Sequence, residues 1–269
     1  MTGIDLAAAP RKPGRLFAAA SALYGMICLA GMAAFSCCSE GSAGLGRRQF
    51  VALCFVELAL VLFVAPLLAV RRVALQKGEQ GLLQFLPDPA GATRIAFATV
   101  LLPLLTSAGL CLIPGIAALA IRTLFGGVPA IDVARATIVI LAFATWAFAL
   151  GFYCSVRCRD AFAAAGCALL VILVVLAQPI WFGPVISSTG EASLMIQASL
   201  LINPAVGVAS AIDFDLFRTE PLYQVCPIGQ RPFEYPSCWA VASLYLCLSA
   251  VLIWRSVSGF RRMAEPAIS

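Results

Sequence analysis

The chain has 269 residues, of which 62% are hydrophobic and 12% are charged, and its formal net charge is +5. Soluble globular domains carry about a quarter of their residues as charged side chains, so this composition excludes an ordinary soluble protein and predicts a polytopic membrane protein. The sequence contains no histidine, which excludes Ser-His-Asp and Cys-His catalysis and histidine-ligated zinc. It also contains no Walker A segment with which to bind ATP.

Six apolar runs of about spanning length predict an all-α fold with six transmembrane helices. They cover residues 16–35, 50–70, 95–120, 136–156, 161–185 and 239–254. If the N-terminus is cytoplasmic, about two thirds of the lysines and arginines fall on the inner side. This bias predicts that the tails, residues 1–15 and 255–269, both lie in the cytoplasm.

The segment Arg71–Arg94 is charged and separates the second run from the third. Read as a helix, it places Leu75, Leu82 and Leu86 on one stripe and glutamines and a lysine on the opposite face. This pattern predicts an amphipathic helix at the membrane interface. One interpretation is a cytoplasmic loop whose apolar half rests on the lipid headgroups.

Three residues give this segment more definition than a simple loop. Pro87 and Pro89 fix φ and remove two backbone donors, so we expect the helix to stop near Leu86. Glu79 lies on the apolar side, where a carboxylate needs a donor such as Arg71 or a backbone N–H group.

The order Glu79-x-Gly81-x-Leu83-x-x-Leu86-Pro87 resembles the first cytoplasmic segment of type-2 ABC exporter permeases, which reads E-x-x-x-G-T-L-x-x-L-x-x-x-P. Here the glutamate and glycine are closer together than in the family pattern, and a leucine replaces the threonine. In that family this segment contacts the ATPase subunit. The resemblance therefore implies that the ATPase-coupling residues are Arg71, Arg72, Lys77, Glu79, Gly81, Leu83, Leu86, Pro87 and Pro89.

The region 186–238 between the fifth and sixth runs is not uniformly polar. Its part from Ala192 to Ile212 is apolar but interrupted by Asn203-Pro204, which predicts a re-entrant hairpin of short helices outside the cytoplasm. Type-2 ABC permeases similarly place re-entrant helices here, so the resemblance holds at a second place. It implies that Asn203 and Pro204 belong to an outer gate.

Two cysteines, Cys226 and Cys238, lie in the polar remainder of this region. An extracytoplasmic compartment allows a disulfide between them, and the pattern leaves open whether it forms. Most of the other cysteines lie inside apolar runs, where we expect small packing residues rather than metal ligands.

Glu57 lies within the second apolar run. A carboxylate at that depth must be neutral, paired or facing water. One interpretation is a protonated carboxyl hydrogen-bonded inside the bundle, and the other is a polar residue that lines a transport path or a proton relay.

The resemblance implies a permease subunit for ATP-driven transport, most simply export, in a bacterial plasma membrane. The chain would not be catalytic: a separate ATPase subunit would hold ATP and Mg²⁺, and a second permease copy or a paralogue would complete the path. No basic surface indicates nucleic-acid binding. The alternatives are a proton-coupled carrier that uses Glu57, a non-transporting scaffold, and a membrane thiol-redox protein that uses Cys37, Cys38, Cys226 and Cys238.

Overall fold

The structure is a computed structural model and describes residues 45–78, 127–158, 160–188, 192–219 and 233–264, together with 223, 226 and 228. In these residues all regular structure is helical, which confirms the all-α prediction for this part of the chain. The helices are α2 Leu45–Gly78, α5 Ala130–Arg157, α6 Ala161–Ser188, α7 Ala192–Ile202, α8 Pro204–Ala211 and α10 Cys238–Ala264.

Four described helices are long and apolar enough to cross a membrane, as expected for a multi-pass membrane protein. The qualifying segments are Gly46–Arg71, Ala130–Arg157, Ala161–Trp181 and Cys238–Ser258. They correspond to the predicted second, fourth, fifth and sixth runs. The predicted first and third runs, 16–35 and 95–120, lie outside the described residues.

Helix α2 is longer than the second predicted run at both ends. It begins at Leu45 and continues through Arg71 to Gly78, so the start of the predicted interfacial helix is continuous with a spanning helix. The sequence from Arg71 to Gln76 contains neither proline nor glycine, and nothing local interrupts the helical hydrogen bonds there.

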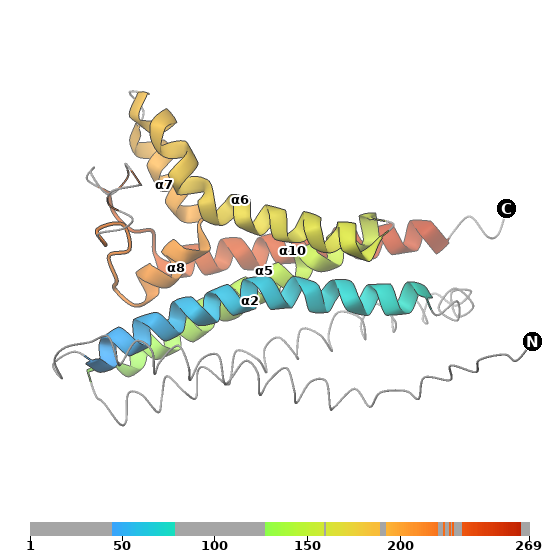
Figure 1. Ribbon diagram of the computed structural model, residues 1–269, viewed down its shortest axis with the longest axis horizontal. Helices are drawn as coiled ribbons and strands as arrows, with labels where there is room; N and C mark the ends of the chain where they lie inside the picture. Colours follow the sequence, from blue (N-terminus) through green and yellow to red (C-terminus); the bar gives the residue numbers. More distant parts are fainter. Residues whose placement is uncertain are drawn as a thin grey trace, which may run out of the picture.

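Helix α5 is the centre of the described bundle, and α6 lies at its periphery. The buried share of the spanning segment is 72% for α5 and 17% for α6. α5 packs against both α2 and α10, and it runs parallel to α2 (Figure 1). The two parallel helices lie close together where Gly151 meets Pro66: a Cβ atom added to Gly151 would lie 2.5 Å from the Pro66 carbonyl oxygen.

The buried apolar residues form two separate clusters. The larger one joins α2, α5, α8, α10 and part of α6, and we call it the bundle core. The smaller one gathers around α7 and contains Ile196, Leu200, Val206, Phe217, Cys226 and Ile228, with Phe233 and Tyr235 packed against it. We call α7 together with Phe217, Cys226, Ile228, Phe233 and Tyr235 the outer cap.

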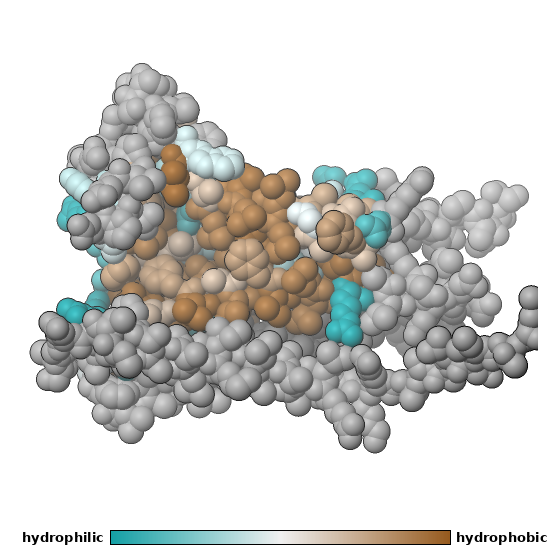
Figure 2. All heavy atoms as spheres, in the orientation of Figure 1, coloured by the Kyte–Doolittle hydropathy of each residue, from teal (hydrophilic) through white to brown (hydrophobic). Residues whose placement is uncertain are grey.

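On the face of the described bundle that Figure 2 shows, hydrophobic side chains form a band between hydrophilic patches toward its two ends. Large apolar side chains on α6 and α10 are exposed, among them Phe162, Leu170, Trp239 and Trp254. Such a face is stable in contact with lipid rather than water.

Candidate functional site

The α7–α8 corner is built by the dipeptide Asn203-Pro204. Proline restricts the residue before it to extended backbone, and Asn203 has φ −87° and ψ 121°. α7 therefore ends at Ile202, and Pro204 begins α8. The Asn203 Oδ1 atom accepts a hydrogen bond from the Ala205 N–H at 2.9 Å and caps α8.

The other side of the Asn203 amide holds helix α6. Its Nδ2 atom donates to the carbonyl oxygens of Val175 at 3.1 Å and Leu176 at 3.0 Å. Val175 lies four residues before Pro179, whose ring nitrogen has no hydrogen to give to the Val175 carbonyl. Asn203 supplies the missing donor, and with both amide atoms bonded it stays buried at 2% exposure.

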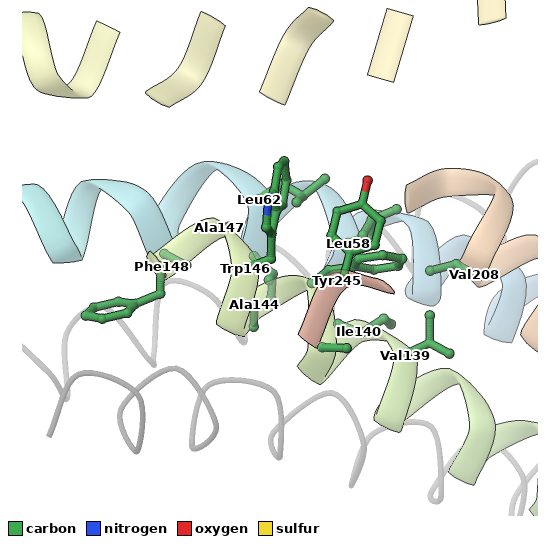
Figure 3. Packing of buried hydrophobic residues seen from close by; sticks show 14 of the residues in the cluster. Leu58, Leu62, Val139, Ile140, Ala144, Trp146, Ala147, Phe148, Val208 and Tyr245 are labelled. Atoms are coloured by element: carbon green, nitrogen blue, oxygen red, sulfur yellow. The ribbon is translucent and has the colours of Figure 1, made fainter. Parts of the chain in front are cut away.

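The last carbonyl of α7 is tied to the bundle core. The Tyr245 hydroxyl of α10 donates to the Ile202 carbonyl oxygen. The Tyr245 ring makes edge contacts with Phe143 and Trp146 of α5, with centroid distances of 4.7 Å and 4.9 Å. Figure 3 shows this aromatic group beside Leu58 of α2. The corner is thus anchored on α10 through one phenol and on α6 through one amide.

Helix α8 is fixed at both its middle and its end. Gly207 lies so close to α5 and α10 that an added Cβ would be 2.8 Å from side-chain atoms of Phe143 and Val241. At the C-terminal end, the Arg47 guanidinium of α2 donates to the carbonyl oxygens of Ile212 at 3.1 Å and Asp213 at 3.2 Å. A cation at this end also favours the helix dipole.

The outer cap carries its own polar contacts around Tyr235. The Tyr235 hydroxyl donates to Asp215 Oδ1 at 3.0 Å and accepts from the Phe217 N–H at 3.3 Å. Asp215 also pairs with the exposed Arg218 at 3.3 Å. Burial, with a contribution from the neighbouring Asp215 carboxylate, raises the pKa of Tyr235 well above its ordinary value, so the phenol stays a donor.

The disulfide that the sequence left open does not form in the structure, where Cys238 is a free cysteine. The two residues belong to different clusters. Cys226 is buried in the cluster around α7, and its Sγ contacts the Pro179 carbonyl oxygen at 3.5 Å. Cys238 begins α10 and packs in the bundle core.

Glu57 lies in α2 at 4% exposure. Its Oε1 atom is buried and has no hydrogen-bond partner among the described residues. Among the described residues, no hydrogen bond or ion pair joins Glu57 to Asn203.

The predicted ATPase-coupling residues divide into two groups. Arg71 is exposed near the end of α2, and Arg72 and Lys77 also belong to that helix. The remaining six lie outside the described residues: Glu79, Gly81, Leu83, Leu86, Pro87 and Pro89.

Sequence reasoning missed three residues that hold the corner, namely Pro179, Tyr245 and Arg47. Pro179 inside an apolar run was the available signal, because a proline in a helix always leaves one carbonyl without its partner. Among the described residues no cluster of three or more Cys, Asp or Glu side chains could hold a metal ion.

Comparison of the chain with known protein families and with curated proteins finds no match.

Proposed function

We propose that this protein is the permease subunit of an ABC transporter and forms the path for ATP-driven export. The observation that carries the proposal is the α7–α8 corner, in which two short helices inserted between α6 and α10 are anchored on both by Asn203 and Tyr245. An ordinary connection between two spanning helices does not need such anchoring, whereas an outer gate must follow the helices that line the path.

Charge at the opposite end supports the position of a cytoplasmic partner. Arg71, Arg157 and Arg255 are exposed. Each belongs to the C-terminal half of its helix, and α2, α5 and α10 run in the same direction along the bundle (Figure 1). In our proposal this is the cytoplasmic side, where basic residues concentrate, and the segment Arg71–Arg94 receives the movement of a separate ATPase subunit that binds ATP and Mg²⁺.

In this proposal one chain supplies half of the transporter. A second copy or a paralogue faces it across the path in the plasma membrane, and Asn203-Pro204 contributes to the outer gate. Closure of the ATPase dimer moves the coupling segment, and the rigid helices transmit that displacement outward.

The test is purification of the tagged full chain from its native membrane in mild detergent, with identification of the proteins that accompany it. We expect an ATPase subunit with a Walker A loop, and we expect a neutral linker in place of Arg71–Arg94 to release it. The matched control replaces Arg261 and Arg262 with glutamine, which removes basic charge elsewhere on the same side and should leave the partner bound. Recovery of the intact chain without any ATPase would refute the proposal.

A second candidate function follows from Glu57, because its buried Oε1 has no described partner. We propose as the alternative a proton-coupled carrier in which this carboxyl exchanges a proton during transport. Proteoliposomes holding the purified chain would then take up protons under an imposed membrane potential, and Glu57→Gln would abolish the uptake. Asp132→Asn is the matched control, because Asp132 is also a buried carboxylate at 6% exposure. Equal uptake by wild type and Glu57→Gln would exclude this function.

A further inference from the structure

Helix α6 has a break in its backbone hydrogen bonding at Pro179. The proline ring removes the donor for the Val175 carbonyl and displaces that carbonyl from the helix axis, which is the usual cause of a sharp helix bend. Figure 1 shows α6 following the bundle and then bending away, with α7 returning beside its outer segment.

The α7–α8 corner donates hydrogen bonds to the backbone of α6 at this bend. The Val175 carbonyl oxygen, to which Pro179 has no N–H to donate, accepts a hydrogen bond from Asn203 Nδ2 at 3.1 Å. The same amide donates to Leu176 at 3.0 Å, and Cys226 of the outer cap reaches the Pro179 carbonyl at 3.5 Å. The contacts at the bend therefore come from the corner and from the outer cap.

Asn203 also lies at the boundary between two packed units. On one side is the outer cap with its own buried cluster, and on the other is the bundle core that holds α8. A change in the bend of α6 would break the Asn203 bond to Val175 unless the corner followed, because the Val175 carbonyl has no helical donor at Pro179 and would be left unpaired in a buried site.

We propose that Asn203 is a latch that couples the bend of α6 at Pro179 to the outer cap, so that the outer segment of α6 and α7 move as one unit against the bundle. As the moving part of an outer gate, this unit rests on the proposed function. The coupling itself is a property of the chain alone, and it can be measured without transport or an ATPase.

Hydrogen–deuterium exchange of the full chain in lipid nanodiscs measures the coupling directly. Asn203→Ser keeps an oxygen that can cap α8 but removes the amide donor. We expect it to speed exchange in outer α6 (residues 177–188) and in α7 together, by about tenfold, as for one lost amide–carbonyl bond. The rates in α5 should not change. Faster exchange in α7 and α8 alone, or an equal rise in every helix, would overturn the proposal.

Pro179→Ala gives the decisive second variant, because it returns an amide donor to the Val175 carbonyl. In that background Asn203→Ser should change outer α6 exchange by less than about threefold, since the helix then bonds itself. Pro66→Ala is the matched control: it removes a proline from the interior of α2 and should leave the effect of Asn203→Ser at its full size. If the single variant Asn203→Ser does not yield folded protein, adding Pro179→Ala to it must restore the folded chain, and adding Pro66→Ala must not. Equal effects of Asn203→Ser in all three backgrounds would overturn the latch.

Ser210→Ala controls for the loss of any polar contact in this region. The Ser210 hydroxyl donates to the Pro236 carbonyl at 2.7 Å and so joins α8 to the residues before α10, away from Pro179. Its loss should speed exchange only near α8 and residues 233–237. A rise in outer α6 exchange as large as that of Asn203→Ser would contradict a specific role for Asn203.

Discussion

The bundle core and the outer cap are stabilised in different ways. The bundle core consists of long apolar helices that pack over their length, with a backbone-to-backbone approach at Gly151 and Pro66. The outer cap has one short helix and a few irregular residues, held by aromatic contacts and by side chains that bond backbone groups. A loss of packing space should therefore damage the bundle, whereas a loss of single polar groups should loosen the cap and the segments bonded to it.

The largest expected effect is on the bundle. Gly151→Ala would place a methyl group within 2.5 Å of the Pro66 carbonyl oxygen, so α2 and α5 must separate. We expect a loss of about 2–3 kcal/mol in the free energy of unfolding, measured by denaturing-detergent titration of the purified chain. Gly166→Ala is the control, because an added Cβ there meets nothing within 4 Å. Equal losses in the two variants would show that the close approach does not limit stability.

The next effect should separate the cap from the bundle. Tyr245→Phe keeps the ring between Phe143 and Trp146 and removes only the donor to Ile202. We expect a loss of about 1 kcal/mol, seen as faster amide exchange at the end of α7 with little change in α5. Tyr153→Phe serves as the control, because its ring contact with Arg157 does not need the hydroxyl. Uniform destabilisation of both regions would contradict the division into two units.

High pH should act on the cap before the bundle. Because burial raises the pKa of Tyr235 in the folded chain, the folded state favours the protonated phenol. The stabilisation it gives is complete below the ordinary tyrosine pKa of about 10 and is lost as the pH rises above that value. Amide exchange in the cap should therefore accelerate beyond pH 10 relative to α5. Tyr235→Phe should remove this extra acceleration, and its persistence would assign the effect to another group.

The smallest effect is expected at the surface of the cap. Arg218 and Asp215 form an ion pair whose side chains are 67% and 40% exposed. Arg218→Ala should cost less than about 0.5 kcal/mol, and added salt should reduce the difference further. Exchange rates in the cap should match those of the wild-type chain within error. A larger loss would mean that this pair holds the cap together.

The sequence predicted those parts of the fold that depend on local pattern. Apolar length predicts the helices from Ala130 and Ala161 because a spanning segment must satisfy its own backbone. The corner at Asn203 was predicted for the same local reason, since a proline and the residue before it end a helix.

The remaining contacts depend on residues distant in sequence. Asn203 bonds a carbonyl 28 positions earlier, and Arg47 bonds a carbonyl 165 positions later, so no local pattern reveals either bond. The Cys226–Cys238 disulfide does not form because the two cysteines pack in different clusters. The number of cysteines in the region and the redox state of its compartment do not reveal this separation. Composition indicates that buried polar groups need partners, but only the fold identifies them.

Helix α2 is one continuous element that joins the end of α8 to the segment that begins at Arg71. The helix has 34 residues, so at 1.5 Å per residue it is about 50 Å long. Its N-terminal part contains Arg47, which donates a hydrogen bond to the Ile212 carbonyl at the end of α8. It also contains Phe55, whose ring centroid lies 5.9 Å from that of Phe214. Its near end is Gly78, within the segment to which we assign the ATPase contact. A push on that near end would travel to α8 along this one helix, in which Pro66 is an interior position that lacks a backbone donor.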